Sequence, residues 1–348
     1  MKTRKRRCLF LWPEVKRSIG LGHLYETLAV AQAAAGEGYH CTFLLAPYEP
    51  AKEVLAKTGF PYVEIRGGVR EILRRREIRK AAYGNPFVLN HRAVKLSNQR
   101  LLGRAGFRVV VIDQLGGLRI EADVLVNSSP VRAWHRYSFG RVPPRTLFGL
   151  RYALLRSEFR KISGSSGRAV KVVVMMGGVD RTGATVRIAR ALKNLPIEGE
   201  IVLILGPGFR HNEELRKVLS EAGRRRRFVP LRAVSNVADV LRGAAFLICA
   251  GGNSLFEAAA LGIPSLVLWE DGHERIQGRA CENLGFALCL GSGRKTPLCR
   301  IRSEVLRLLE SKEERLRMAK RARKCVDGLG TLRLLEVLEE REGNRPIY

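Results

Sequence analysis

The chain has 348 residues, of which 46% are hydrophobic, so it is long and apolar enough to form two domains of ordinary size. Its apolar runs, such as residues 170–176 and 244–250, have the length of strands, and none approaches the roughly 20 residues of a membrane-spanning helix. The 62 lysines and arginines exceed the 33 acidic residues by 29. This composition argues against a disordered chain and against a membrane-spanning one.

The basic excess lies mainly in four runs, at residues 2–7, 70–80, 224–227 and 315–324. Nucleic acid, an anionic membrane surface and phosphorylated substrates all fit such a charge. No helix-turn-helix, zinc-finger or RNA-binding signature accompanies it, so we expect no specific nucleic-acid partner. An anionic lipid surface is the favoured partner, with a general basic bias of composition as the alternative. This favours a cytoplasmic protein, peripheral on the inner face of the membrane.

The seven cysteines are scattered and form no CxxC pair. We therefore expect buried thiols in a reducing compartment, without a zinc site, another metal or a disulfide framework.

Strand-like and helix-like stretches alternate along the first half of the chain, which is the rhythm of a parallel sheet covered by helices on both faces. The expected strands are residues 8–12, 39–46, 62–65, 109–113 and 124–127. The expected helices run from the glycine loop at 19–23 to residue 35, and over 50–58, 70–80 and 92–105.

An irregular, proline-bearing stretch at 132–160 precedes KISGSSGR at 161–168, which has the composition of a linker. The second half repeats the rhythm, with strands at 170–176, 200–205, 228–230, 246–249 and 265–268 and helices at 183–192, 213–222, 237–241, 254–261 and 274–284. We therefore expect two doubly wound, Rossmann-like parallel-sheet domains, at 1–160 and 169–310, followed by a helical tail at 311–348. Such domains bind ligands at the carboxyl ends of their strands, here in an interdomain cleft.

In each domain, one glycine loop follows the first expected strand. In the first, Gly20 and Gly22 precede His23 at the start of a helix, where the helix dipole favours a neutral imidazole that can act as a base. A histidine that only caps or packs on the helix is the alternative. In the second, Gly177 and Gly178 suit backbone contact with a diphosphate, although a tight turn would explain them as well.

The third loop carries the strongest signal. Gly251, Gly252, Asn253 and Ser254 would direct backbone N–H groups at phosphate oxygens, at the start of a helix. Glu257 follows about one turn later, where a carboxylate accepts hydrogen bonds from both ribose hydroxyls. Its alternative role is to complement the helix dipole.

The fourth loop, at 269–277, again joins a strand end to a helix start. His273 and Gln277 are four residues apart and share a helical face, as ligands of sugar hydroxyls would. Taken alone, such a pair is more often a solvated surface.

The stretch GGNSLFEAAALGIPSLVLWEDGHERIQGRACENLG resembles the C-terminal domain of glycosyltransferase family 28, and GLGHLYETLAVA is similar to the first loop and helix of that family. The family includes the lipid-linked N-acetylglucosaminyltransferase of peptidoglycan synthesis. The resemblance implies the two-domain GT-B fold, a UDP-N-acetylhexosamine-type donor, no cofactor, and a ribose-binding role for Glu257.

The blocks VIDQLG, ADVLVN, GLRYALLRSEF and MGGVD also resemble, in the same order, the UDP-sugar hydrolase of the pseudaminic acid pathway. That resemblance implies that His23 is a general base that activates water. The hydrolase pattern has an arginine three residues after the histidine, whereas this chain has Glu26, a reversal of charge.

We therefore expect a UDP-sugar-dependent glycosyltransferase of cell-surface polysaccharide biosynthesis, with a lipid-linked acceptor and with His23 or Asp113 as the base. The alternatives are a UDP-sugar hydrolase, a non-catalytic protein that binds nucleotide sugar or nucleic acid, and an epimerase, for which no pair of carboxylates facing the sugar can be identified.

Overall fold

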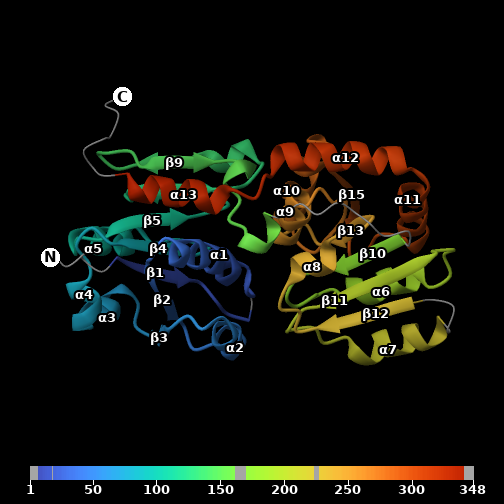
Figure 1. The fold of residues 1–348 in the computed structure, drawn as a ribbon, viewed down its shortest axis with the longest axis horizontal. Coiled ribbons are helices and arrows are strands. Elements are labelled where there is room, and N and C mark those ends of the chain that lie inside the picture. The colour runs from blue at the N-terminus through green and yellow to red at the C-terminus, as the bar shows by residue number, and fades with distance from the viewer. Residues whose placement is uncertain (1–6, 18, 161–169, 223–226, 341–348) are drawn as a thin grey trace. The chain divides into compact units, whose positions relative to one another are not determined.

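The computed structural model describes residues 7–17, 19–160, 170–222 and 227–340 (Figure 1). The chain divides into two compact units, unit 1 (Met1–Ser157 with Gly328–Tyr348) and unit 2 (Glu158–Asp327). The expected linker at 161–168 lies outside the described residues. The expected C-terminal tail is shared between the units, because α12 (Lys312–Cys325) belongs to unit 2 and α13 (Gly330–Glu339) to unit 1.

Unit 1 is built on a seven-stranded sheet in the order β3-β2-β1-β4-β5-β7-β9, with every neighbouring pair parallel. Its strands are β1 (Cys8–Pro13), β2 (His40–Leu45), β3 (Tyr62–Glu64), β4 (Pro86–Asn90), β5 (Arg108–Ile112), β7 (Val124–Asn127) and β9 (Arg145–Phe148). The order reverses between β1 and β4, which makes this the switch point of a doubly wound sheet. A short parallel pair, β6 (Arg119–Ile120) and β8 (Ser138–Phe139), lies outside this sheet.

Helices cover both faces of the unit 1 sheet. They are α1 (Gly22–Gly36), α2 (Glu49–Thr58), α3 (Val69–Arg74), α4 (Arg76–Lys80), α5 (Leu96–Arg104) and α13, with single turns of 3-10 helix at Arg132–His135, Leu150–Tyr152 and Ser157–Phe159, the last of which crosses the boundary into unit 2. Buried residues of α1, α2 and α13 form one core with the sheet, while those of α3, α4 and α5 form the other. The returning helix α13 packs on α1 through residues such as Leu334 and Leu335, which explains why the tail is not a separate part.

Unit 2 has a six-stranded parallel sheet in the order β12-β11-β10-β13-β14-β15. Its strands are β10 (Val170–Met175), β11 (Gly199–Leu205), β12 (Arg227–Arg232), β13 (Phe246–Cys249), β14 (Ser265–Trp269) and β15 (Ala287–Ser292). Its switch point lies between β10 and β13. The loops after these two strands are the second and third glycine loops identified in the sequence, so the sheet order brings them together.

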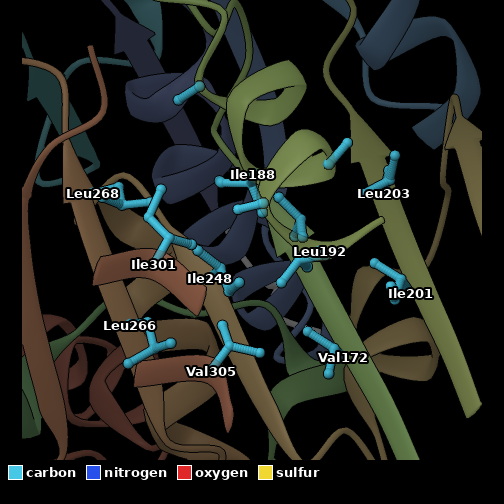
Figure 2. Close-up of a cluster of buried hydrophobic side chains, with 14 of the residues drawn as sticks. Val172, Ile188, Leu192, Ile201, Leu203, Ile248, Leu266, Leu268, Ile301 and Val305 are labelled. Atoms are coloured by element: carbon cyan, nitrogen blue, oxygen red, sulfur yellow. The ribbon is translucent and has the colours of Figure 1, made fainter. Parts of the chain in front are cut away.

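The helices of unit 2 are α6 (Ala184–Leu192), α7 (Asn212–Glu221), α8 (Val237–Leu241), α9 (Asn253–Ala260), α10 (Gly272–Asn283), α11 (Leu298–Glu310) and α12. Figure 2 shows the core in which α6 and α11 meet the sheet through side chains such as Ile188, Ile301 and Val305. Because these side chains are excluded from water and interdigitate, they fix the strands whose carboxyl ends carry the loops.

Two arginines of α12 lie at the carboxyl-terminal ends of α9 and α10. The Arg323 guanidinium lies against Gly262, just after α9, and the Arg321 guanidinium lies against Gly285, just after α10. A positive charge at that end of a helix complements its dipole. Part of the basic tail therefore stabilises the two helices whose opposite ends face the glycine loops.

The two doubly wound parallel domains predicted from the sequence are confirmed. The expected helix at 70–80 is broken at Arg75, whose extended backbone separates α3 from α4. Among the strands of the two large sheets, the prediction omitted β4, β9 and β15, and it also omitted the short pair β6 and β8. Of these, β4 matters most, because it lies in the centre of the unit 1 sheet between β1 and β5.

Candidate functional site

The first turn of α9 follows directly from the third glycine loop. Gly251 has a φ of +101°, and a Cβ atom there would lie 3.0 Å from Val267 Cγ1 and 3.1 Å from the Glu274 carbonyl oxygen. Only glycine allows the backbone to lie this close to α10. The N-cap residue Gly252 has no side chain of its own with which to cap the amides of Asn253 and Ser254.

The neighbouring helices at this edge differ from α9. The Asp180 carboxylate accepts hydrogen bonds from the Ala184 and Thr185 amides at 2.8 and 2.9 Å and thereby caps α6. The Asp271 carboxylate accepts from the Glu274 amide at 3.0 Å and caps α10. At the unit 2 switch point, α9 therefore offers the N-terminus best suited to an external anion.

Glu257 lies on α9 one turn after Asn253 and is half-buried. Residues four apart share a helical face, so its carboxylate projects on the same side as the start of the helix.

The fourth loop supports the third. Gln277 is buried, and its side-chain amide donates a 2.7 Å hydrogen bond to the Gly251 carbonyl oxygen. In the structure, Gln277 therefore holds the third glycine loop against α10. His273 is the second residue of α10 and half-buried.

The second glycine loop packs against a turn that the sequence analysis overlooked. The Gly208 amide donates to the Gly178 carbonyl oxygen at 2.8 Å, and a Cβ atom at Gly206 would lie 2.4 Å from the Gly177 carbonyl oxygen. The Gly-Pro-Gly turn after β11 thus packs against the carbonyl oxygens of Gly177 and Gly178. This packing favours the interpretation of the glycine pair as a tight turn.

Two carboxylates beside these loops were not predicted. Glu270 accepts hydrogen bonds from the amide and hydroxyl of Thr182 at 3.1 and 3.0 Å, which joins the loop after β14 to the loop after β10. Glu274 accepts from the Glu270 amide at 2.8 Å. Burial raises the pKa of both carboxyl groups, to about 7 for Glu274. Both acids lie in the fourth loop, in which only His273 and Gln277 were predicted to contact a ligand.

In unit 1, His23 is the second residue of α1, after the turn in which Gly20 adopts a φ of +81°. The N-cap residue Leu21 provides no side-chain cap for this helix. The His23 carbonyl oxygen accepts hydrogen bonds from Thr27 Oγ1 at 2.9 Å and from Asn90 Nδ2 at 3.3 Å. The candidate base is therefore fixed at the carboxyl edge of the unit 1 sheet, and Gly22 begins its helix.

Glu26, the position of reversed charge, is buried in the same helix. Its carboxylate accepts a 2.8 Å hydrogen bond from Asn90 Nδ2 and another from Gln114 Nε2. These partners follow or end β4 and β5, so Glu26 connects α1 to β4, which borders the switch point, and to its neighbour β5. Asn90 was not identified from the sequence because β4 was omitted, and Gln114 was not singled out within the block VIDQLG.

Asp113, the other expected base, is buried and already hydrogen-bonded. Its Oδ2 atom accepts from the Gly116 and Leu115 amides at 2.7 and 3.2 Å and from the Tyr137 hydroxyl at 2.7 Å. Burial raises the pKa of the Asp113 carboxyl, and these donors oppose the rise. The arrangement holds the loop after β5, which favours a structural role over proton transfer.

His91 follows β4 directly and was also overlooked. Its ring packs edge-on against Trp12, with 4.6 Å between ring centroids. Burial is the main cause that lowers the pKa of His91 to about 4, and the nearby charge of His23 acts in the same direction. The switch point of unit 1 therefore carries two neighbouring imidazoles.

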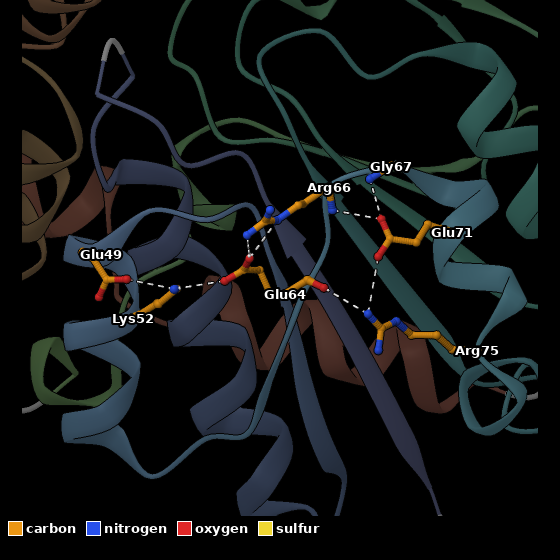
Figure 3. A network of polar contacts seen from close by, with 7 residues as sticks. All are labelled: Glu49, Lys52, Glu64, Arg66, Gly67, Glu71 and Arg75. Atoms are coloured by element: carbon orange, nitrogen blue, oxygen red, sulfur yellow. Dashed lines mark hydrogen bonds and ion pairs between the residues drawn. The ribbon is translucent and has the colours of Figure 1, made fainter.

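The basic run at 70–80 is mostly unpaired. Figure 3 shows the polar network beside it, in which Glu71 pairs with Arg75 and Lys52 lies between Glu49 and Glu64. The remaining basic side chains of the run are exposed and make no ion pair within the described part of the chain: Arg70, Arg74, Arg76, Arg79 and Lys80. Within that same part, no helix combines the length and apolar character needed to cross a bilayer.

No protein family model matches the chain. It is 26% identical over 171 residues to the spore coat polysaccharide biosynthesis protein SpsG of Bacillus subtilis; the match covers 49% of this chain and 50% of SpsG. The chain thus spans about half the length of this curated relative.

Among solved structures, Acinetobacter baumannii MurG is similar over 97% of this chain and 100% of its own, with a TM-score of 0.67 and 14% identity. The spinosyn rhamnosyltransferase SpnG complexed with thymidine diphosphate is similar over 95% of this chain and 100% of its own, with a TM-score of 0.59 and 15% identity. These neighbours are GT-B glycosyltransferases, and the GT-B fold predicted from the sequence is confirmed.

Proposed function

We propose that the protein is a UDP-sugar-dependent glycosyltransferase with an N-acetylhexosamine-type donor, acting in cell-surface glycan biosynthesis. The observation that carries the proposal is the start of α9, where the N-cap residue is Gly252, which has no side chain to cap the helix, and Glu257 lies one turn after Asn253 on the same face. Backbone amides at a helix start bind phosphate, and a carboxylate accepts hydrogen bonds from vicinal hydroxyls. A ribose diphosphate presents both groups.

The donor would bind unit 2 at the switch point of its sheet. Gly251, held against α10 by Gln277, sets the path of the backbone under the diphosphate. The complex of the neighbour SpnG with thymidine diphosphate supports a nucleoside diphosphate as the ligand class. His273, at the start of α10, is the candidate contact for the sugar hydroxyls.

The acceptor would bind unit 1, with His23 as the general base. An acceptor oxygen attacks the anomeric carbon while the bond from that carbon to the diphosphate breaks, and His23 takes the acceptor proton. The leaving diphosphate gains negative charge in this step. The amides at the start of α9 stabilise that charge, because they are oriented before the reaction begins.

The exposed cations of α3 and α4 support a lipid-linked acceptor and a peripheral position on an anionic membrane surface. Each lysine or arginine close to the surface of an anionic bilayer contributes about 1 kcal/mol to binding. The polysaccharide role printed for SpsG is compatible with this assignment.

The test measures UDP release from a panel of UDP-sugars, with and without lipid-linked sugar acceptors. We expect release that requires an acceptor and falls at least a hundredfold in His23→Ala, as expected for loss of general-base catalysis. His40→Gln, at the exposed start of β2, is the matched control and should retain activity. No stabilisation by any nucleotide sugar, where ligand at 100 times Kd should add about 2.7 kcal/mol, would contradict the proposal.

Hydrolysis of the UDP-sugar is the second candidate, favoured by the position of His23 in the first turn of α1, whose N-cap residue Leu21 provides no side-chain cap, because a base there can also activate water. Stoichiometric UDP release without any acceptor, abolished in His23→Ala, would establish hydrolysis and exclude transfer as the main activity.

A further inference from the structure

His91 is held rigidly at the end of β4. The Glu14 amide donates to the Asn90 carbonyl oxygen at 2.8 Å, and the Arg92 amide donates to Glu14 Oε2 at 2.9 Å. The residues on both sides of His91 are therefore tied to the segment that follows β1. Packing against Trp12 fixes the ring itself.

Only one of the two ring nitrogens of His91 has a hydrogen-bond partner among the described residues. The imidazole makes a hydrogen bond to the backbone of Trp12, while Nε2 is buried and has no hydrogen-bond partner within the described residues. The bond to the Trp12 carbonyl places the proton on Nδ1, which leaves Nε2 as an acceptor. A buried acceptor without a donor costs free energy, so this atom is unusual in a native site.

The charges around His91 do not make it a cation at physiological pH. Glu14 is ionised and paired with Lys16 Nζ at 2.7 Å, and it favours a proton on His91. Burial outweighs that effect and lowers the pKa of His91 to about 4, while His23 and Lys16 act in the same direction. Nε2 therefore remains an acceptor throughout the physiological range.

We propose that His91 is a second imidazole of the acceptor site in unit 1, whose Nε2 atom accepts a hydrogen bond from an O–H group of the molecule that His23 activates. This inference rests on the proposed role of His23. Two neighbouring acceptors suit a ligand with two O–H donors, which means a vicinal diol of an acceptor sugar or, in a hydrolase, a water molecule.

The division of roles follows from the chemistry. The reacting oxygen bonds to the anomeric carbon as the bond to the diphosphate breaks, its proton passes to His23, and the electron pair leaves with UDP. His91 receives no proton and orients the ligand through the second O–H group. His91 is thus a positioning residue, because it contacts the second hydroxyl and not the reacting oxygen.

The first experiment records nitrogen NMR of the full protein labelled with ¹⁵N-histidine, with the His91 signals assigned by their absence from His91→Phe. We expect the Nδ1–H tautomer and no titration between pH 5 and 8. A proton on Nε2, or titration near pH 6.5, would overturn the proposal. This measurement does not depend on any enzymatic activity, so it separates failure of this inference from failure of the proposed function.

The second experiment compares kinetics of wild type, His91→Phe and His91→Gln with the donor and acceptor that support UDP release. His91→Phe keeps a ring against Trp12 but loses the acceptor, and we expect its acceptor KM to rise about tenfold. UDP affinity and the acid limb of the pH profile should not change. His91→Gln, whose amide oxygen can still accept a hydrogen bond, should recover part of the loss and also serves if the phenylalanine variant does not fold.

The two sources of the O–H group give different outcomes. A diol acceptor predicts the rise in acceptor KM, whereas water predicts a lower kcat for acceptor-free hydrolysis. Wild-type kinetics in both substituted proteins would show that Nε2 contacts no ligand, for example because it binds only a structural water, and would contradict the proposal.

Discussion

Glu274 makes the stability of unit 2 depend on pH in a direction unusual for a carboxylate. Burial raises the pKa of Glu274 from 4.5 to about 7, although the Glu270 amide donates to it at 2.8 Å. The unfolded chain releases this proton near pH 4.5, while the folded chain keeps it until about pH 7. The stabilisation is therefore complete below pH 4.5 and is lost as the pH rises to 7.

Glu274→Gln removes this dependence while keeping the size of the side chain and an oxygen that accepts from the Glu270 amide. A difference from 4.5 to about 7 corresponds to about 3 kcal/mol, at about 1.4 kcal/mol for each pH unit. We expect the two proteins to differ least near pH 4.5. As the pH rises to 8, the free energy of unfolding of the glutamine variant should increase relative to that of wild type by up to about 3 kcal/mol.

The assay is urea unfolding at pH 5, 6, 7 and 8, followed by ¹⁹F NMR of protein labelled with 5-fluorotryptophan. The three tryptophans are Trp12, Trp134 and Trp269, and Trp269 reports on unit 2. Glu213→Gln, at an exposed position of α7, is the control and should show no pH-dependent difference. A difference between Glu274→Gln and wild type that stays constant across this range would refute the reasoning.

Three further variants test separate parts of the account. Gly251→Ala puts a Cβ atom at φ +101° within 3.1 Å of α10, so we expect a loss of about 2 kcal/mol in urea unfolding and weaker UDP binding by calorimetry. Tyr137→Phe removes the hydrogen bond to the buried carboxylate after β5 and should cost about 1 to 3 kcal/mol, whereas an unchanged unfolding curve would deny that bond a structural role. The double variant Arg79→Glu/Lys80→Glu should weaken flotation with anionic vesicles more than about tenfold without altering UDP affinity, and equal flotation would remove α4 from the membrane surface.

The sequence predicted the parts of the site that are local in the chain. The loops after β10, β13 and β14 were found because glycines, a helix start and a following carboxylate occur within a few residues of one another. The order of the elements was also predictable, because apolar runs alternated with amphipathic ones. In each case the pattern and the structure that it predicts lie in the same segment.

The parts that were missed depend on contacts between distant segments. The strand β4 is a five-residue run buried on both faces after a turn at Gly84 and Asn85, so it shows no alternation that would predict a strand. Without β4, Asn90 and His91 could not be placed at the switch point beside α1. The pairing of Glu26 with Gln114, 88 residues away, appears only when the strand order is known.

Gln277 illustrates a third kind of difference. Its spacing from His273 predicted that both side chains contact sugar hydroxyls, because four residues make one helical turn. In the structure Gln277 turns inward to the Gly251 carbonyl oxygen, since the glycine loop lies directly against α10. Helical spacing identifies the shared face but not the backbone that packs on it.

The central claim is that the start of α9 binds the diphosphate and that Glu257 binds the ribose. Calorimetric titration of UDP and of 2′,3′-dideoxy-UDP into wild type and Glu257→Gln tests it most directly. We expect wild type to prefer UDP by more than about tenfold, as two hydrogen bonds to a charged group imply, and Glu257→Gln to lose most of that preference. Equal affinity of wild type for the two nucleotides, or an unchanged preference in Glu257→Gln, would contradict the account.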